Sequence, residues 1–531
     1  MNPLGSPKCA GRLLMGLAAI TSIFLITGCG NGNGGIVPIN PVGFSNSSLT
    51  GTYVFSTIGV DSNEGAPLSL AGAFQANGTG GIGGGTMDVV APGLDVLETG
   101  QSINPNSSYY VNSDGRGQVT LNISGGTSVL DFVLTSTSHG LVTEFDGNGT
   151  GSGTLDLQTA LTGQSQIAGP YAFAMGGFDG GGNPYATVGA INLDVNGNIT
   201  TGTQDFNDDA EDVYEVTPTG TVLVGSGTAP GVAAFTSTEQ AFDFYPIDAT
   251  HFKLIETDGE EFLAGDAYTQ TGASIPSAMA FSMVGGTFTG AADAGLMTYS
   301  EGTFSGYGEA NLNGVLNQIE SFTGTPGATG VGGRIFVALD GFIPANTWAV
   351  YPSAGGLLMM EYDGAGVTLG AAYSQTSGQT IAPTENYGLN LSALNISGDY
   401  VENDIAQSLT TTSDTFSGPI DISDDFGGGD VNLTTQTLAG TYSVNSDGTG
   451  SVTTTIQNST YIGFDFFPVN SNVLLLLETD NFQIGAGVYE LQTPPSGGVA
   501  QSRSSQSRIS LARPLILKPA ARAQMAARHK K

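Results

Sequence analysis

Four acidic segments of fifteen residues have a spacing that could bind a metal ion or carry out acid–base chemistry. They begin at Glu144, Glu256, Glu361 and Glu478. In each, an Asp follows the Glu by two residues, a Gly takes the tenth position and a Gln closes the segment. These residues are Asp146, Gly153 and Gln158; Asp258, Gly265 and Gln270; Asp363, Gly370 and Gln375; and Asp480, Gly487 and Gln492. Because residues two apart on a strand face the same side, the paired carboxylates can act together.

Calcium binding is one interpretation of these acids. In three copies another Asp lies thirteen residues before the Glu, and the intervening hairpin is expected to fold it back towards that Glu. Three carboxylates suit Ca²⁺, which takes six to eight oxygen ligands. The predicted sites combine Asp131, Glu144 and Asp146; Asp243, Glu256 and Asp258; and Asp465, Glu478 and Asp480. The third copy has Ala349 near this position and is expected to be defective, while the acidic loops from Asp205 and Asp421 are further candidates.

Strand register is the favoured alternative, and it needs no cofactor. A hairpin folded about the middle of each segment would place the Glu opposite the Gln, as in Glu144 and Gln158. Directly opposed side chains lie about 5 Å apart at Cβ, within reach of a hydrogen bond. The Gly at the tenth position would then allow a bulge or a close backbone approach.

Glycan hydrolysis is the catalytic alternative, since paired carboxylates in a cleft cleave glycosidic bonds. Enzymes rarely carry four degenerate copies of one site, so we expect no enzymatic activity. Both His139 and His251 are interpreted as surface residues near turns. The only cysteines are Cys9 and Cys29, which leaves the body of the chain without thiolate chemistry.

Internal duplication organises the chain. Besides the acidic segments, aromatic landmarks recur at Tyr53, Tyr171, Phe281 and Tyr387, and short alternating apolar stretches are separated by Gly, Asn and Asp turns. These patterns predict an all-β fold of four tandem modules of about 110 residues, each an eight-stranded antiparallel up-and-down barrel. The modules are expected at 49–162, 167–274, 275–380 and 385–495. The strand count and the opening G-x-Y-x-F resemble lipocalin and avidin barrels, and hollow barrels would make the protein a small-ligand carrier.

The N-terminus has the pattern of an export signal. Lys8 and Arg12 precede an apolar run, and residues 1–28 are expected to form a signal peptide. The segment from Leu25 to Cys29 resembles the lipobox of bacterial lipoproteins, which implies cleavage before Cys29 and its lipidation. Gly30 follows the cysteine instead of Asp, which by the same resemblance implies the outer membrane. Residues 29–48 then form a flexible tether, and the chain is similar to uncharacterised Gly-rich β-repeat lipoproteins of soil-dwelling Gram-negative bacteria.

Charge limits the partners. The net charge is −34, with 47 Asp and Glu against 13 Lys and Arg. The basic residues gather at the two ends and leave only Arg116, Lys253 and Arg334 between them. Nucleic acid is excluded, because its binding needs basic side chains. The basic tail, 496–531, is expected to be disordered and able to contact anionic surfaces. We therefore expect a lipid-anchored cell-envelope protein with a binding, adhesive or structural role, whose partner is the membrane and an envelope glycan or small ligand.

Overall fold

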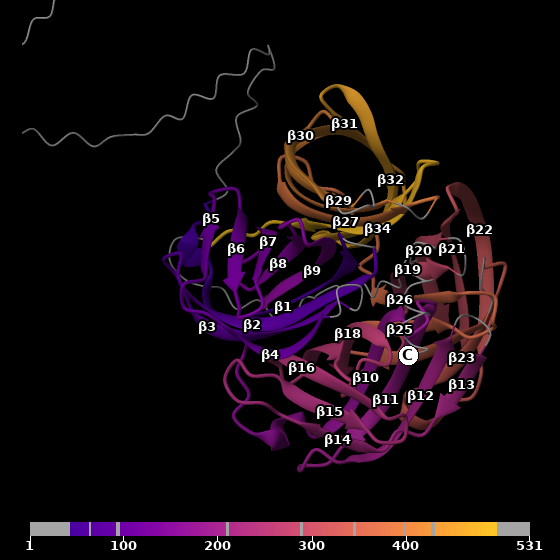
Figure 1. Cartoon of the computed structure of the whole chain (residues 1–531). Coiled ribbons are helices and arrows are strands. Elements are labelled where there is room, and N and C mark those ends of the chain that lie inside the picture. The colour runs from indigo at the N-terminus through magenta and orange to yellow at the C-terminus, as the bar shows by residue number, and fades with distance from the viewer. Residues whose placement is uncertain are drawn as a thin grey trace, which may run out of the picture. The chain divides into compact units, whose positions relative to one another are not determined.

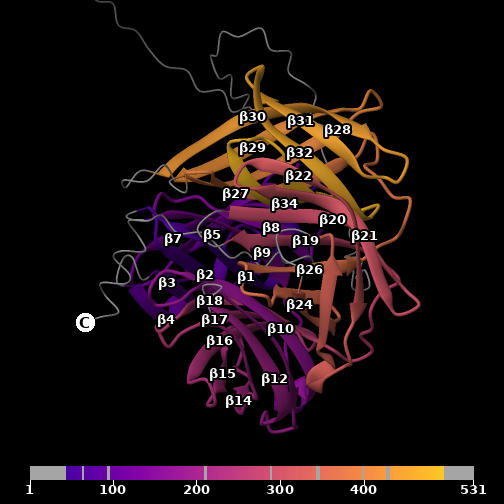
Figure 2. The same cartoon turned by 90° about the vertical axis from the view of Figure 1, so that its right-hand side faces the viewer.

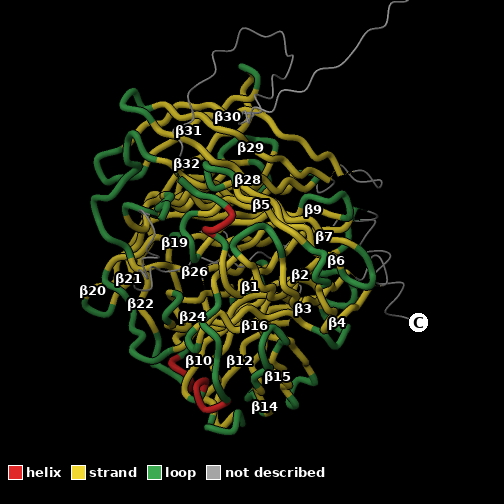
Figure 3. The backbone as a smooth tube through the Cα atoms, turned by 90° about the vertical axis from the view of Figure 1, so that its left-hand side faces the viewer, coloured by secondary structure: helices red, strands yellow, loops and turns green. Residues whose placement is uncertain are grey.

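The structure is almost entirely β-strand. This computed structural model describes residues 43–62, 65–91, 96–208, 212–286, 290–342, 347–397, 400–425 and 431–495. The helices within these ranges are three single 3-10 turns, η1 (Asn46–Ser48), η3 (Gln164–Ile167) and η4 (Val331–Gly333), seen against the strands in Figure 3. No helix in the described ranges has the length and apolarity to span a bilayer. The predicted all-β class is confirmed.

Modules 1 and 2 are nine-stranded antiparallel sheets, as labelled in Figure 1. Module 1 comprises β1 (Thr50–Asp61), β2 (Pro67–Asn77), β3 (Ile82–Ala91), β4 (Val96–Ile103), β5 (Ser108–Val111), β6 (Arg116–Asn122), β7 (Thr127–Leu134), β8 (His139–Glu144) and β9 (Gly149–Leu157). Module 2 comprises β10 (Gly169–Phe178), β11 (Pro184–Leu193), β12 (Ile199–Asp208), β13 (Asp212–Val216), β14 (Gly220–Leu223), β15 (Gly231–Phe235), β16 (Gln240–Asp248), β17 (His251–Glu256) and β18 (Phe262–Thr269).

Modules 3 and 4 are closed eight-stranded barrels, and Figure 2 gives a second view of their strands. Module 3 comprises β19 (Ala278–Gly286), β20 (Gly290–Ser300), β21 (Thr303–Leu312), β22 (Val315–Pro326), β23 (Ile335–Asp340), β24 (Thr347–Ser353), β25 (Gly356–Glu361) and β26 (Val367–Ser374). Module 4 comprises β27 (Asn386–Asn395), β28 (Val401–Thr410), β29 (Thr415–Asp425), β30 (Val431–Val444), β31 (Gly450–Ile456), β32 (Ser459–Asn470), β33 (Val473–Glu478) and β34 (Gln483–Leu491). Four tandem modules are therefore confirmed, and two of them have the predicted eight strands.

The ninth strand of modules 1 and 2 arises from a proline. Modules 3 and 4 each have one long fourth strand, β22 or β30. In module 1 two short strands, β4 and β5, take its place on either side of Pro105, and in module 2 β13 and β14 do so on either side of Pro218. Proline has no N–H to donate to a sheet and interrupts the ladder. Each half still pairs with its proper neighbour, β4 with β3 and β5 with β6. The divided strand thus occupies the place of the continuous one.

Each module has its own packed interior. Large side chains from successive strands meet inside it, and in module 1 they include Phe55, Phe74 and Phe132, each at most 1% exposed. Equivalent interior clusters fill modules 2, 3 and 4. Burial of this apolar surface, worth roughly 25 cal/mol per Å², stabilises the modules.

The outer faces of several strands are buried as well, because the modules pack against one another. The strands β8, β17, β25 and β33 are buried at nearly every position. Outward side chains of β8, β25 and β33, such as Leu141, Met360 and Leu475, join an apolar cluster with members from all four modules. Ile255 of β17 belongs to a second cluster, which it shares with Val54 of module 1. Packing runs from β2 to β17, from β11 to β25, from β20 to β33 and from β28 to β8. Each module therefore packs its second strand on the next module, and module 4 packs on module 1.

Candidate functional site

The acidic hairpin turns directly after the Glu, and not at the middle of the segment. In module 1, β8 ends at Glu144 and β9 begins at Gly149. The residue two before each Glu pairs with the Gly of the tenth position: Val142 with Gly153, Leu254 with Gly265, Met359 with Gly370 and Leu476 with Gly487. The prediction that each Glu faces its Gln is therefore wrong. The sequence after each Glu is a short polar turn, and it closes the hairpin early.

The four repeated glutamates point into the interiors of their modules. Each is paired directly with a core residue and shares its face: Glu144 with Leu130, Glu256 with Phe242, Glu361 with Trp348 and Glu478 with Phe464. None is more than 2% exposed. Burial raises the pKa of Glu361 to about 8 and the pKa of the other three well above the usual range.

The repeated aspartates hold the turn. Asp146 accepts hydrogen bonds from the backbone N–H groups of Asn148 at 2.8 Å and Val129 at 2.9 Å. Asp258 and Asp363 make the same pair of contacts in modules 2 and 3, and Asp480 accepts from two turn N–H groups in module 4. An Asp that caps its own turn in this way has a structural role.

The repeated glycines allow the first strand to approach closely, as predicted. A Cβ added at Gly153 would lie 1.7 Å from the carbonyl oxygen of Ser56. The corresponding contacts are 2.0 Å at Gly265, 2.2 Å at Gly370 and 2.5 Å at Gly487, each to a backbone oxygen. No side chain fits at this position.

The repeated glutamines join neighbouring modules. The side-chain amide of Gln158 donates to the carbonyl of Pro246 at 2.7 Å, Gln270 to Pro352 at 3.0 Å and Gln375 to Pro468 at 2.8 Å. Gln492 closes the series by donating to Leu134 of module 1 at 2.8 Å, where Leu134 takes the position of the prolines. The sequence signal for this role is the nearly constant spacing, 23 or 24 residues, between each Gln and the second residue of the Y-P, F-P or V-L pair before it. This pattern does not by itself predict contact between modules.

The remaining predicted calcium ligands face away from the glutamates. Asp131 pairs with Thr143, one position out of phase with Leu130 and Glu144, and accepts a hydrogen bond from Gln118 at 2.8 Å. Asp243 and Asp465 take the same position in their modules. Since adjacent strand residues face opposite sides, the three predicted sites do not assemble.

These outward acids meet carboxyl groups of the preceding module. Asp243 lies beside Asp88, which also accepts a hydrogen bond from Tyr245 at 2.8 Å, and burial chiefly raises the pKa of Asp88 to about 7. Burial and the neighbouring Glu309 raise the pKa of Asp465 to about 8.

Arginines occupy the other two contacts between modules. Arg116 lies 3.3 Å from Asp421, and both are near Asp131. Burial raises the pKa of Asp131 to about 7. Where module 3 has Ala349, Asp205 is instead paired with Arg334 at 2.7 Å. In the third copy an arginine thus neutralises the acid of the neighbouring module. The sequence alone had suggested that this copy is defective.

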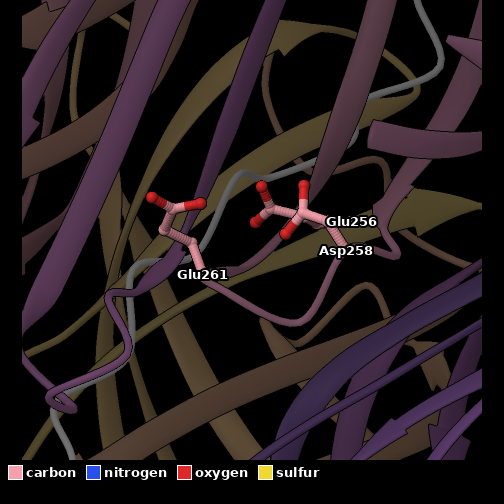
Figure 4. A group of neighbouring side chains, drawn as sticks. All are labelled: Glu256, Asp258 and Glu261. Carbon is pink, nitrogen blue, oxygen red and sulfur yellow. The ribbon is translucent and has the colours of Figure 1, made fainter. Parts of the chain in front are cut away.

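Within the described ranges, two groups of acids have the proximity that a metal ion needs. Glu256, Asp258 and Glu261 lie around the turn of module 2, as Figure 4 shows. This group contains two of the predicted ligands, joined by Glu261 instead of Asp243. Glu402, Asp404 and Asp424 form the second group, in module 4, and all three are buried. The sequence signal for this second group is the alternation of acids in β28 and β29. The acidic segment from Asp421, predicted as a loop, forms the end of β29 and contributes Asp424.

The two body histidines are buried, contrary to their prediction as surface residues. His139 lies 2.8 Å from Asp156 and 3.3 Å from Glu490 of module 4. Burial lowers the pKa of His139, but the two carboxylates outweigh this effect and raise the pKa to about 10. His251 pairs with Asp266 at 2.6 Å. Both histidines have structural ion partners.

The predicted signal peptide (1–28), Cys29, the tether as far as residue 42 and the basic tail lie outside the described residues. The last part of the predicted tether, 43–48, is packed on module 1, where Phe44 and Ser48 are buried.

Comparisons with known proteins give only distant likenesses. No family profile and no curated protein matches the chain. An AttH protein of Nitrosomonas europaea is 12% identical over 44% of this chain and 98% of its own, with a TM-score of 0.19. Kievitone hydratase of Nectria haematococca is 10% identical over 63% of this chain and 91% of its own, with a TM-score of 0.18. Transferrin-binding protein B of Haemophilus parasuis is 10% identical over 67% of this chain and 83% of its own, with a TM-score of 0.18. Likenesses at this level do not bear on what this chain does.

Proposed function

We propose that this chain is a lipid-anchored protein of the bacterial cell envelope, whose four β modules form one binding or structural head without catalytic activity. The observation that carries the proposal is the filled interior of every module. Trp348, Tyr53 and Phe173, among the largest of the side chains there, are at most 1% exposed. Recognition is therefore left to the outer surface.

The carrier alternative has less support. A barrel that carries a small ligand needs an interior cavity lined with a few polar groups. Here stacked and tilted aromatic pairs occupy the interiors, such as Tyr387 with Tyr489 at 4.4 Å between ring centroids.

The hydrolase alternative needs two carboxyl groups facing a substrate cleft. The repeated glutamates are sealed from solvent and the outward acids face a neighbouring module.

The cell-envelope location rests on the segment that ends at Cys29. Lipid chains on a single cysteine hold a protein at a bilayer, at about 0.8 kcal/mol per buried CH₂. Such an anchor would present an acidic head, with a net charge of −34 for the chain, to neutral or cationic partners. An envelope glycan is the partner class that this charge favours over phosphate polymers.

Labelling with a palmitate analogue tests the anchor directly. Cells that produce the full chain are grown with the analogue, and the protein is isolated from membrane and soluble fractions. We expect labelled protein in the outer-membrane fraction, and unlabelled protein from Cys29→Ser. The matched control is Cys9→Ser, which should keep the label. Unlabelled wild-type protein in the soluble fraction would contradict the proposal.

A further inference from the structure

Three carboxylates from two adjacent strands meet at one end of the module 4 interior. Glu402 on β28 pairs directly with Asp424 on β29, and Asp404 lies two positions further along β28 on the same face. One oxygen of each lies within 4.8 Å of the others. Ligand oxygens at 2.3–2.6 Å from an ion can be separated by up to about twice that distance, so this spacing suits an ion at the centre.

A fourth buried carboxylate points into the same interior. Glu478 is 0% exposed, faces inward beside Phe464, and lies close enough to Glu402 for repulsion between the two charges. Neither of its oxygens has a hydrogen-bond partner. The Oδ1 atoms of Asp404 and Asp424 are also buried without a partner. Buried polar atoms nearly always have a partner, so these oxygens call for a ligand.

The opposite sides of these carboxylates are held in place. Tyr400 donates to Glu402 at 2.9 Å, Tyr461 donates to Asp404 at 2.8 Å and also to Glu402, and Gln483 donates to Glu402. Such contacts orient ligands from behind in metal sites. They leave the unpartnered oxygens free to face an ion.

The described part of the chain supplies no cation to this cluster. Its ion pairs place Arg116 on Asp114 and Asp421, Lys253 on Asp266, Arg334 on Asp205 and Glu215, and the histidines on Asp156, Glu490 and Asp266. Buried carboxylates without compensation are strongly destabilising. A bound ion would remove that cost.

We propose that Glu402, Asp404 and Asp424 form a divalent-cation site of the calcium class inside module 4, with Glu478 as a neighbouring buried acid. The ligands are all oxygens, which suits Ca²⁺ and disfavours Zn²⁺, whose protein ligands are chiefly Cys and His. Several carboxylates at flexible spacing suit Ca²⁺ better than Mg²⁺, which demands near-octahedral geometry and keeps several waters. The site would stabilise module 4 and does not depend on the lipid anchor.

Module 3 offers a matched control at the same end of its barrel. Asp293 is 0% exposed, neither of its oxygens has a hydrogen-bond partner, and it lies beside Glu361. Its module lacks a group of three acids with the proximity of the module 4 cluster among the described residues. Asp293→Asn therefore removes a comparable buried acid outside the proposed site.

Calcium titration of the chelator-treated full chain in detergent tests the proposal. We expect one Ca²⁺ bound per chain by calorimetry and a higher melting temperature with Ca²⁺. Asp404→Asn and Glu402→Gln should each weaken binding by about tenfold or more and abolish the melting shift, while Asp293→Asn keeps both. Wild-type protein that binds no Ca²⁺ and melts at the same temperature with and without it would overturn the proposal.

A second measurement does not depend on folding of the variants. Tyr400 and Tyr461 contact the carboxylates, so Tb³⁺ bound there should show tyrosine-sensitised luminescence in the wild-type protein. We expect added Ca²⁺ to quench this signal at far lower concentration than Mg²⁺. An absence of sensitised luminescence, or equal competition by the two ions, would count against the site.

Discussion

The repeated Glu, Asp, Gly and Gln of each acidic hairpin have four separate tasks. The Glu enters the barrel, the Asp caps the turn, the Gly admits the first strand and the Gln reaches the next module. A change in spacing would move each side chain to the wrong face. The fixed spacing therefore follows from packing at the level of single residues.

Gly153→Ala should destabilise module 1. Its methyl group would lie 1.7 Å from the Ser56 carbonyl oxygen, so the paired strands must separate. Overpacking of this kind costs about 1–3 kcal/mol, and a lower melting temperature by calorimetry is expected. The control is Gly126→Ala in the same module, where nothing lies within 4 Å of the added Cβ. Equal melting temperatures for the two variants would disprove the close approach.

Glu361→Gln should make stability less dependent on pH. The pKa of this carboxyl is about 8 in the folded state against 4.5 ordinarily. Between these values the folded state binds more protons than the unfolded state, so stability falls as pH rises, by at most about 1.4 kcal/mol per pH unit. At a pH near 4.5 the variant should have the same melting temperature as the wild type, and above pH 8 it should have a higher melting temperature.

The control for this pH profile is the exposed Glu301 of the same module. Glu301→Gln should retain the wild-type dependence of melting temperature on pH. Parallel profiles for Glu361→Gln and the wild type would show that burial of Glu361 does not oppose its ionisation.

At the scale of elements, the alternating apolar pattern was sufficient to predict strands and four modules. The pattern could not predict that the outer faces pack against other modules. Small residues on an outer face suit burial and exposure alike, so a strand buried on both faces and a strand with one exposed face have similar sequences. Glu144 shows the same limit. The strand that contains Glu144 was predicted correctly, but Gln158 was the wrong cross-strand partner. The position of the turn depends on the backbone geometry after the Glu, which the pattern does not specify. The division of one strand at Pro105 or Pro218 could be explained only once its continuous counterparts β22 and β30 were known.

Gln492→Ala should weaken the contact between modules 4 and 1. The amide donates to two carbonyls, Asp114 and Leu134, each at 2.8 Å. Truncation would leave buried acceptors without donors, at a cost of about 1–3 kcal/mol. Urea unfolding should begin at a lower concentration than for the exposed control Gln457→Ala in the same module. Identical unfolding curves would remove this glutamine from the account.

At the scale of the whole molecule, two of the three basic residues of the body, Arg116 and Arg334, are placed between modules, while Lys253 pairs with Asp266 of its own module. Arg334 of module 3 pairs with Asp205 of module 2, and Arg116 of module 1 pairs with Asp421 of module 4. Composition shows that the body has only three basic residues, but not that two of them, Arg116 and Arg334, have partners on other modules. Contacts over hundreds of residues leave no local pattern in one sequence.

Arg334→Gln should separate modules 2 and 3 more readily. It leaves Asp205, which is 0% exposed, without its counter-charge. Loss of one partner of a buried pair costs about 3–5 kcal/mol, so we expect faster limited proteolysis between residues 270 and 278. Arg116→Gln should leave the cleavage rate of this linker unchanged, since it acts at another contact. Unchanged proteolysis of Arg334→Gln would contradict the role of this pair.

The most direct test is whether module 4 meets module 1. The backbone N–H of Thr493 donates to the carbonyl of Thr135 at 2.7 Å. In a background without native cysteines, made by Cys9→Ser and Cys29→Ser, Thr135→Cys with Thr493→Cys should form an intramolecular disulfide at low protein concentration, seen as faster migration on a non-reducing gel. The control pairs Thr135→Cys with Ser413→Cys, an exposed position of module 4. A closed series of four modules predicts rapid cross-linking of the first pair only, and cross-linking of neither pair, or of both equally, would contradict it.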